Sequence, residues 1–445
     1  MTGNPYLQGN FGPVEEELTA TDLPVQGEIP TELCGRLLRI GPNPVAADPA
    51  IYHWFLGNGM VHGLRLRDGN ADWYKARYVR DDAVTAHSGW PEVPGPRPAM
   101  DIGSGVANTN IIEHAGKTLA IVEAGNLPVE LDDELETLGR CDLNGAVAQG
   151  FSAHPHRDPD TGELHTAVYS PAWSHIQYLS VDAAGHLKRR VNVPTPGKPM
   201  VHDCMFTQNY FILLDLPVTF DEQAAVAGMP FPYTWDPDYG ARVGLLPRDG
   251  EAGDVSWHEV ELCYVFHPVN AYEDDQGRVI MNVARHSRMF ATDRHGPNEG
   301  PTRLDQWVID PTKSRVQESC IDEHPQEFPR LDERRAGRRH RYAYTTQLAE
   351  GFNTSGLLKH DAVEGRRLTH QQGSHRHFME SVFVPKHKDA QEDEGWVMAY
   401  VYDDSKDSSD VVILNAQDFD GEPQAIISLP RRVPFGFHGN WLADH

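Results

Sequence analysis

The sequence predicts an all-β fold, a seven-bladed β-propeller decorated by loops and short helices. Most of the chain consists of short runs of β-branched and aromatic residues separated by Asp, Gly and Pro turns, and few segments show a helical period. Strand–turn–strand units with an acidic turn recur along the chain. A two-sheet sandwich would also contain many strands, but 445 residues are too many for one.

The predicted propeller occupies residues 35–445 as a single domain and follows an N-terminal leader, residues 1–34. Its first strand is the run Gly-Arg-Leu-Leu-Arg-Ile at residues 35–40, after which comes the turn Gly-Pro-Asn-Pro. Two long insertions, residues 80–105 and 219–248, are rich in Pro, Gly and aromatic residues. We expect them to form loops or short helices rather than strands.

The acidic turns give the number of blades. Neighbouring turns lie 50 to 67 residues apart, which is about one propeller blade lengthened by insertions. Because acidic turns are common in β proteins, the predicted number of blades rests on their spacing and not on their presence. The seven turns are centred near Asp68, Asp132, Asp182, Asp249, Asp310, Asp361 and Asp420.

Composition restricts the partners of the protein. The chain has 39 Lys and Arg against 65 Asp and Glu, a formal net charge of −26, which disfavours nucleic acid and anionic lipid as partners. No apolar run approaches the roughly 18–20 residues of a membrane span, and the N-terminus lacks a signal-peptide pattern. The five scattered cysteines fit reduced thiols. We expect a cytoplasmic protein with no obligatory protein partner.

Histidine and glutamate side chains follow the seven turns at similar distances. If each of these positions is the inner end of a blade's innermost strand, all seven side chains point toward one axis. The histidines are His154, His202, His267 and His438, which come 18 to 22 residues after their turns. The glutamates are Glu327 and Glu380, 17 and 19 residues after theirs, and Glu123, which comes 55 residues after Asp68 across a long insertion.

This set of side chains suits a metal site. Four neutral imidazoles bind Fe, Zn, Cu or Ni, but they leave the double positive charge of the metal uncompensated. Glutamates behind three of them can accept the other ring N–H and supply negative charge. Four histidines on one side of an octahedral metal leave two adjacent positions open. The remaining histidines, such as His53, His62, His156, His324, His375 and His377, are expected to be ordinary hydrogen-bonded side chains.

The same residues carry a family resemblance that covers residues 35–441. The motifs are Gly-Asn-Gly-Met-Val-His at 57–62, Ser-Ala-His-Pro at 152–155, Val-His-Asp at 201–203, Phe-His-Pro-Val-Asn-Ala-Tyr-Glu at 266–273, Glu-Phe-Pro-Arg at 327–330 and Phe-Gly-Phe-His-Gly-Asn-Trp at 435–441. They resemble the motifs of the carotenoid cleavage oxygenases. The resemblance implies a seven-bladed propeller with one Fe(II) per chain on its axis, under a dome of loops that encloses a hydrophobic tunnel.

The resemblance also implies the reaction, in which O2 is the co-substrate and a conjugated C=C bond is cleaved into two carbonyl products. It makes His154, His202, His267 and His438 the iron ligands, with Glu123, Glu327 and Glu380 behind them, and places Thr109 near an open coordination site. Candidate aromatic residues of the tunnel wall are Phe55, Trp90, Phe151, Trp173, Phe206, Phe266, Phe437 and Trp441.

The sequence departs from the family pattern in two places, and the second bears on the substrate. Leu56 and Asn58 stand where the family usually has acidic residues, in a stretch that holds no proposed ligand. Val122, directly before Glu123, stands where lignostilbene-type members have a lysine that meets a substrate phenol. A valine there offers only apolar contact, which favours a carotenoid or apocarotenoid over a stilbene-like or phenylpropenyl phenol.

Alternatives to this reaction remain open. Cleavage of such phenols to aromatic aldehydes is the alternative within the same class. A metal-free propeller that serves as an interaction scaffold, and an isomerase on the same fold, are alternatives of other classes. Because polyenes reside in membranes, we expect weak, transient peripheral contact through residues 224–235, whose apolar side chains have acidic neighbours.

Overall fold

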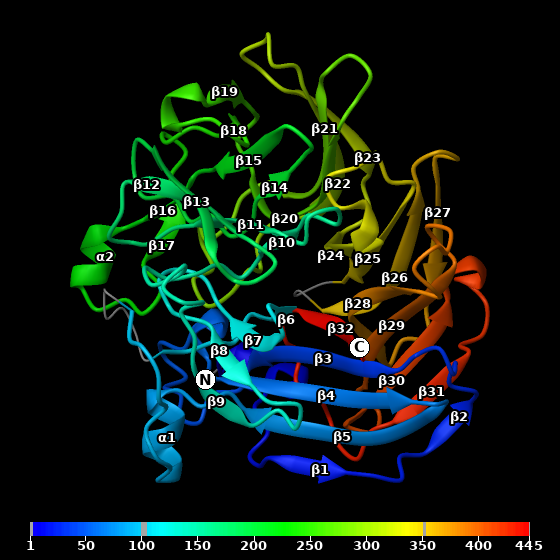
Figure 1. Cartoon of the computed structure of the whole chain (residues 1–445). Helices are drawn as coiled ribbons and strands as arrows, with labels where there is room; N and C mark the ends of the chain where they lie inside the picture. Colours follow the sequence, from blue (N-terminus) through cyan, green and yellow to red (C-terminus); the bar gives the residue numbers. More distant parts are fainter. Residues whose placement is uncertain (1–2, 99–104, 350–352, 445) are drawn as a thin grey trace.

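Seven antiparallel β-sheets surround a common axis in the computed structural model, which describes residues 3–98, 105–349 and 353–444. The sheets follow one another around the ring in chain order, as the colours of Figure 1 show. This arrangement confirms the predicted all-β, seven-bladed propeller.

Each blade contains four main strands, which are named in order from the axis outward. The first blade consists of β32 (Gly439–Ala443), β3 (Gly35–Pro42), β4 (Gly59–Arg67) and β5 (Asn70–Tyr78). The second blade consists of β6 (Asn110–His114), β7 (Lys117–Ile121), β8 (Val129–Leu131) and β9 (Thr137–Arg140). The third consists of β10 (His156–Arg157), β11 (Leu164–Val168), β12 (His175–Val181) and β13 (Leu187–Pro194). The fourth consists of β14 (Met205–Phe206), β15 (Tyr210–Asp215), β18 (Arg242–Pro247) and β19 (Ser256–Glu259).

Three further blades complete the ring. The fifth blade consists of β20 (Tyr264–Glu273), β21 (Val279–His286), β22 (Thr302–Ile309) and β23 (Gln317–Asp322). The sixth consists of β24 (Gln326–Arg330), β25 (Tyr342–Leu348), β26 (Thr354–Asp361) and β27 (Arg366–His370). The seventh consists of β28 (Arg376–Pro385), β29 (Gly395–Asp403), β30 (Ser408–Asn415) and β31 (Ala425–Ser428). Residues 3–34 add an outer strand to two blades, because β1 (Leu18–Ala20) pairs with β5 and β2 (Val25–Gly27) pairs with β31.

The ring is closed by pairing between the first and last strands of the propeller. β3 lies between β4 and β32, and Arg39 pairs with Gly439 in the antiparallel register. Next to this ladder Gly41 and Gly436 approach so closely that a Cβ on Gly41 would lie 2.4 Å from the Gly436 Cα. The Arg39 guanidinium donates to the Gly436 carbonyl at 3.0 Å. The apolar, glycine-containing segment before β32 is therefore explained by close packing inside the ring.

The acidic turns predicted from the sequence join the third and fourth strands of the blades. Asp132 and Asp182 show why an aspartate stands there, because Oδ1 of each accepts two backbone N–H groups of its own turn. Such a side chain replaces backbone hydrogen bonds where the chain reverses. The turn spacing therefore reflects blade architecture.

The two long insertions differ from each other. The first contains α1 (Asp82–Ser88), which Asp81 caps at its N-terminus. We expected the second insertion, residues 219–248, to contain no strands, and the structure shows that this expectation is wrong. It contains most of the hairpin β16 (Val218–Phe220) and β17 (Tyr233–Trp235), the short helix α2 (Glu222–Val226) and also β18, an integral blade strand.

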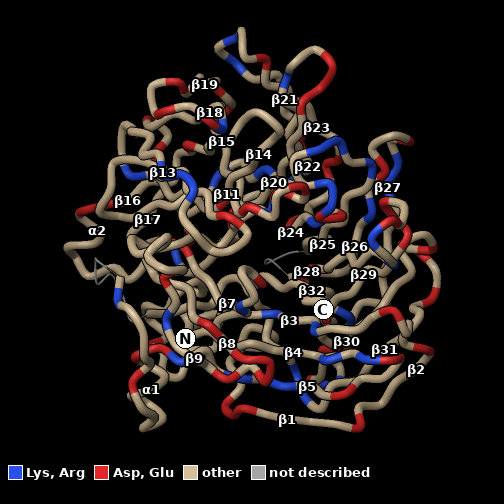
Figure 2. The backbone as a smooth tube through the Cα atoms, in the orientation of Figure 1, with Lys and Arg blue, Asp and Glu red and all other residues tan. Residues whose placement is uncertain are grey.

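Figure 1 places α1 and α2 at the periphery. In the described ranges, single-turn 3₁₀ helices connect other elements. These turns are Pro5–Leu7, Gly9–Phe11, Trp54–Leu56, Ala252–Asp254, Glu333–Arg335 and Ala416–Asp418. Acidic and basic residues are spread over the outer turns and strands (Figure 2). None of the helices in the described ranges combines the length and apolarity that a membrane span requires.

Candidate metal centre

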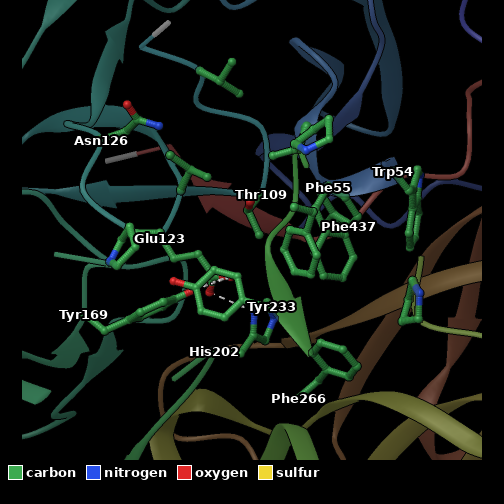
Figure 3. A pocket seen from close by; sticks show the side chains of 18 of the residues that line it. Trp54, Phe55, Thr109, Glu123, Asn126, Tyr169, His202, Tyr233, Phe266 and Phe437 are labelled. Atoms are coloured by element: carbon green, nitrogen blue, oxygen red, sulfur yellow. Dashed lines mark hydrogen bonds and ion pairs between the residues drawn. The ribbon is translucent and has the colours of Figure 1, made fainter. Parts of the chain in front are cut away.

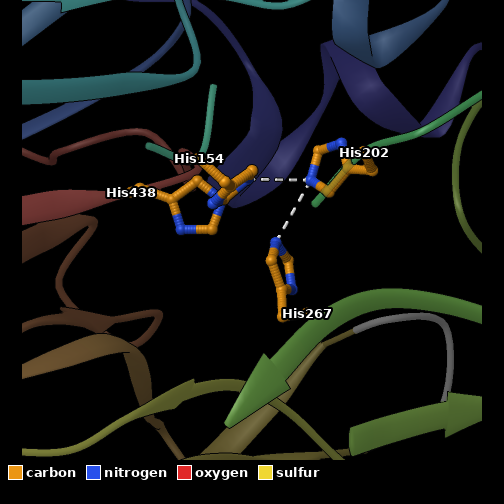
Figure 4. A group of neighbouring side chains, drawn as sticks. All are labelled: His154, His202, His267 and His438. Atoms are coloured by element: carbon orange, nitrogen blue, oxygen red, sulfur yellow. Dashed lines mark hydrogen bonds between the residues drawn. The ribbon is translucent and has the colours of Figure 1, made fainter. Parts of the chain in front are cut away.

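Four histidines from four blades meet at the axis (Figure 4). His154, His202 and His438 lie just before the innermost strands β10, β14 and β32, and His267 lies within β20. All four are buried, and one ring nitrogen from each lies within 4.8 Å of those of the others. The predicted convergence of these histidines is therefore present in the fold.

The spacing of the ring nitrogens suits a metal ion. Nε2 of His202 lies 3.1 Å from Nε2 of His154 and 3.2 Å from Nε2 of His267. A metal–imidazole bond is about 2.0–2.1 Å long, so two nitrogens at right angles on one metal lie about 3 Å apart. Four nitrogens in this arrangement, with no thiolate among them, fit a borderline divalent transition metal.

Irregular strand pairing directs several of these side chains inward. The β20–β21 ladder shifts register around His267, the β24–β25 ladder shifts after Glu327, and the β28–β29 ladder shifts around Glu380. A bulge changes the direction in which a strand presents its side chains and is common beside functional sites. The bulges explain how regular inner strands turn three large polar side chains toward the axis.

Three of the four histidines contact a glutamate through Nδ1. The Nδ1–carboxylate distance is 2.8 Å for His202 and Glu123 and 2.6 Å for His267 and Glu327. It is 2.9 Å for the third pair, His438 and Glu380. Each contact leaves Nε2 of the histidine facing the other imidazoles.

Each glutamate is held by a further group that sequence reasoning did not single out. Tyr169 Oη donates to Glu123 at 3.1 Å, and His286 Nε2 lies 3.2 Å from Glu327. The backbone N–H of Gly439 donates to Glu380 at 2.9 Å. No spacing rule marks these partners, since their relation to the axis arises only when neighbouring blades pack.

His154 is supported differently. Its nearest carboxylate oxygen is Asp203 Oδ2, which lies 3.8 Å from His154 Nδ1 and is too distant for a hydrogen bond. Asp203 Oδ1 instead lies 2.7 Å from Nε2 of His156. The His154 backbone N–H is fixed by the Ser152 hydroxyl at 3.0 Å, which accounts for the serine in the Ser-Ala-His-Pro motif.

Burial and neighbouring charges together set the protonation of this centre. Burial and the neighbouring imidazoles hold the pKa of His154 well below its ordinary value. Burial also lowers the pKa of His438, to about 4, although Glu380 works in the opposite direction. Burial opposes ionisation of Glu380, but His438 and Arg330 outweigh it and lower the pKa of this carboxyl to about 2. His154 and His438 are therefore neutral beside the ionised Glu380, whereas burial of His267 is outweighed by Glu327, which raises the pKa of this imidazole.

The position of Glu123 corrects one step of the sequence argument. Glu123 follows β7, the second strand of its blade, and not the innermost strand β6. Thr109, directly before β6, occupies the seventh axial position. The Thr109 N–H donates to the Ile121 carbonyl at 3.1 Å, so the β6–β7 hairpin returns Glu123 to the same end of the blade.

An apolar cavity of about 500 Å³ opens on one side of the histidines (Figure 3). His202, His267, His438 and Thr109 lie in its wall. Of the candidate aromatic residues, Phe55, Phe266 and Phe437 line the cavity, and they are joined there by Trp54, Phe220, Phe231, Tyr233 and Phe328.

Trp90, Phe151 and Phe206 lie elsewhere, which corrects the expectation that they form the tunnel wall. Phe151 and Phe206 are fully packed in separate hydrophobic clusters between blades. Trp90 lies under the guanidinium of Arg80, 4.6 Å from it. Trp173 likewise stacks on His175, and Trp441 lines a different cavity. An aromatic residue in a β protein fills a core as readily as it lines a pocket, so residue type alone could not separate the two.

Few polar groups interrupt the cavity wall. Tyr169 lies beside Glu123, and Tyr233 lies beside both (Figure 3). Within the described ranges, Tyr233 Oη and Asn126 Oδ1 are buried without a hydrogen-bond partner. Val122 also faces the cavity, next to Glu123.

Asn58, one of the two departures from the family motif, has a structural role. Its side-chain amide donates to Asp81 at 2.8 Å, and its oxygen accepts the Val45 N–H at 3.1 Å. The other departure, Leu56, lines the apolar cavity.

Comparisons with known proteins agree with this fold and site. The family model described as retinal pigment epithelial membrane protein matches residues 11–443. A carotenoid cleavage oxygenase of Mycobacterium tuberculosis is 43% identical over 98% of this chain and 97% of its own length. An isoeugenol monooxygenase of Pseudomonas putida is 30% identical over 99% and 98%. The chain belongs to the carotenoid cleavage oxygenase family and is a carotenoid cleavage-type oxygenase.

Solved structures share the architecture. The lignostilbene dioxygenase of Pseudomonas brassicacearum superposes with a TM-score of 0.89 at 26% identity, covering 99% of this chain and 98% of that one. The cobalt-substituted oxygenase ACO of Synechocystis superposes with a TM-score of 0.86 at 28% identity, covering 97% of each chain. Relatives named for carotenoids and relatives named for aromatic alkenes therefore both resemble this protein.

Proposed function

We propose that the protein is a non-haem Fe(II) dioxygenase that cleaves a conjugated C=C bond of a carotenoid or apocarotenoid into two carbonyl products. One Fe(II) per chain would be held by His154, His202, His267 and His438. The convergence of one ring nitrogen from each of the four histidines supports this assignment, as does the cobalt-substituted relative. Glu123, Glu327 and Glu380 would fix the imidazoles and supply negative charge.

O2 is the proposed co-substrate. Bound Fe(II) would supply the redox chemistry that activates O2. The chain's own residues leave room for it and for the substrate, since the apolar cavity reaches three of the four imidazoles directly. Thr109, also in this wall, is positioned to limit access to one side of the metal. Its hydroxyl donates to Asn108 at 2.8 Å, so its methyl group is available to the cavity.

The cavity that ends at the histidines is the observation that carries the proposed substrate class. A polyene has no charge and few hydrogen-bonding groups, and Phe55, Phe266 and Phe437 offer it an apolar surface. These rings would hold one double bond beside the imidazoles and exclude water, so the cleaved bond follows from how far the substrate enters. Val122 adds apolar contact next to Glu123.

Cleavage of a stilbene-like or phenylpropenyl phenol is the alternative, and one observation favours it. The buried Tyr233 hydroxyl lacks a partner within the described ranges and lies near Glu123, on the cavity side of the centre. A buried hydroxyl without a partner is costly, so a substrate oxygen that met it would bind more tightly. The isoeugenol monooxygenase and lignostilbene dioxygenase are consistent with such a substrate.

The experiment is anaerobic reconstitution with Fe(II), followed by addition of O2 with a panel of apocarotenals and hydroxystilbenes. We expect about one iron per chain and aldehyde or ketone products from the apocarotenals, identified by mass spectrometry. Tyr233→Phe should leave the cleavage of a hydrocarbon-ended polyene unchanged. If only hydroxystilbenes are cleaved and Tyr233→Phe raises their KM, the alternative is correct.

Weak, transient contact with lipid is proposed for the segment around α2. Met229, Pro230 and Phe231 line the cavity, and the neighbouring Val226 is 91% exposed. An apolar side chain beside a cavity wall is suited to receive a substrate from a membrane. Sedimentation with phosphatidylcholine vesicles should recover a minor fraction of the wild-type protein and less of Val226→Asp.

A further inference from the structure

A second cavity, of about 560 Å³, lies on the opposite side of the four histidines. Its wall includes residues of the innermost strand of every blade, namely β6, β10, β14, β20, β24, β28 and β32. It therefore follows the propeller axis and is a separate space from the apolar cavity. We refer to it as the axial channel.

The two cavities approach the same imidazoles from opposite sides. Both contact His267 and His438, whereas His202 lines only the apolar cavity and His154 lines only the axial channel. The histidine cluster thus separates an aromatic space from a polar one. Each space borders three of the four histidines.

This difference decides which route a metal ion can use. A divalent cation in water carries a hydration shell, and moving an ion into an apolar medium without compensating groups is strongly unfavourable. In the aromatic cavity the carboxylates of Glu123 and Glu327 lie directly beside the histidines and not along the approach to them. The axial channel, in contrast, presents carboxylate, imidazole and amide groups along its wall.

Carboxylates occur in the channel wall at different degrees of burial. The Glu333 side chain is 55% exposed, whereas that of Asp203 is 2% exposed. His156 and Asp203 both line the channel, and their ligand atoms lie close enough together to hold a metal ion. Asp203 also lies 3.8 Å from Nδ1 of His154. A chain of potential oxygen and nitrogen ligands thus leads from solvent to the buried cluster.

Two of the three arginines that line the channel are paired with carboxylates, whereas Arg157 donates to the backbone carbonyl of Glu113. Arg330 lies 3.5 Å from Glu380 and 3.3 Å from Glu333, and Arg334 lies 2.6 Å from Asp332. Because these guanidinium groups are paired with carboxylates, their charge opposes a cation less than an isolated arginine would.

We propose that the axial channel is the route by which a divalent cation reaches the four histidines of the folded protein, with His156 and Asp203 as a transit site. This inference rests on the metal-binding function proposed above. The cation exchanges its water ligands first for His156 and Asp203, and then for the inner histidines. Substrate and metal thus arrive from opposite sides of the ring.

Uptake of Co(II) by metal-free protein tests the route, with the visible absorbance of bound cobalt as the readout. We expect His156→Ala to slow uptake about tenfold or more while the final cobalt content stays at about one per chain. Glu333→Lys should slow it by a similar factor at low ionic strength, as expected for lost electrostatic steering, and less at high salt. Glu422→Lys, an exposed charge reversal in the turn after β30, is the matched control and should load at the wild-type rate.

A second set of measurements tests whether the metal ion enters through the apolar cavity instead. A hydroxystilbene bound in the apolar cavity should leave cobalt uptake unchanged, whereas Ile112→Trp, which adds bulk to the channel wall, should slow it. Wild-type uptake rates in His156→Ala, Glu333→Lys and Ile112→Trp would overturn the route and leave the metal site intact. Inhibition of uptake by the stilbene alone would assign the route to the apolar cavity. Failure of wild-type protein to bind cobalt at equilibrium would instead overturn the proposed metal-binding function.

Discussion

His154 and the other three axial histidines are held in different ways. His202, His267 and His438 each lie within 2.9 Å of a glutamate oxygen, whereas the nearest carboxylate oxygen to His154 is 3.8 Å away and belongs to an aspartate engaged with His156. In the proposed site the three glutamates would fix ring orientation and add charge. His154 depends on its backbone contacts and on packing.

This contrast separates three histidines that have a carboxylate oxygen within 2.9 Å of Nδ1 from one that does not. The three carboxylate-supported histidines approach the aromatic cavity, where the substrate must be placed accurately. His154 faces the axial channel, where the proposed transit site exchanges ligands. A ligand without a strong carboxylate partner can reorient at lower cost.

The largest effect is expected from loss of a supported histidine together with its strand. Deletion of the residues after Pro434 removes His438 and β32, so we expect loss of iron binding and a sharply lower melting temperature. His438→Ala removes the ligand but keeps the β3–β32 ladder, and should lose iron while melting close to metal-free wild type. Metal analysis measures the iron content of both variants, and calorimetry measures their melting temperatures. A truncated protein that keeps iron and stability would contradict the closed ring.

Loss of a supporting carboxylate should have the next largest effect. Glu327→Gln keeps the shape of the side chain but removes the charge that faces His267 at 2.6 Å. We expect metal affinity to fall about 10–100-fold, measured by competition with a chelator. Glu318→Gln, on β23 away from the axis, is the matched control. Equal affinities for the two variants would show that Glu327 does not support the ligand.

Asp203→Asn should have a smaller effect on equilibrium affinity. Because Asp203 lies beyond hydrogen-bond distance of His154, we expect affinity to fall less than about tenfold, below the range typical of supporting carboxylates. The same variant should slow cobalt uptake. An affinity loss equal to that of Glu327→Gln would remove the distinction between His154 and the other three.

A buried histidine outside the centre gives the smallest effect and a pH dependence. Burial, followed by the charges of Arg431, Arg39 and Arg432, lowers the pKa of His62 from 6.5 to about 3. Between these values the unfolded chain binds a proton that the folded protein does not, so stability falls as the pH drops from 6.5 toward 3. One such group contributes at most about 1.4 kcal/mol per pH unit.

His62→Gln tests this effect in metal-free protein. His62 Nδ1 lies 2.8 Å from the Tyr74 hydroxyl. Glutamine keeps a polar side chain at this position but does not titrate. We expect denaturant titrations between pH 4 and 6.5 to show a shallower pH dependence for the variant. An unchanged slope would mean that His62 does not remain neutral in the folded state.

The sequence allowed the ring and its axis to be predicted because both follow local rules. Asp132 and Asp182 stand at turns for a hydrogen-bonding reason, and turn spacing then gives the blades. The apolar segment around His438 is buried where β32 pairs with β3, which closes the ring.

Other features depend on packing between blades. The position of Glu123 could not be placed correctly, because a hairpin that returns to the axis has no fixed sequence distance. Asp203 and Tyr169 approach the centre through side-chain directions that spacing does not encode. Phe151 and Phe266 have the same chemistry, yet one fills a core and the other lines the cavity.

The β3–β32 ladder also sets the order of events when the chain is made. Arg39 and Gly436, which bond beside this ladder, are 397 residues apart. At about 5–20 residues per second, roughly 20–80 s of synthesis separates them. During that interval one edge of β3 lacks its final partner and can pair with another nascent chain. Since His438 directly precedes β32, the same late event completes the metal centre. The four histidines can therefore meet only once this late segment has been made.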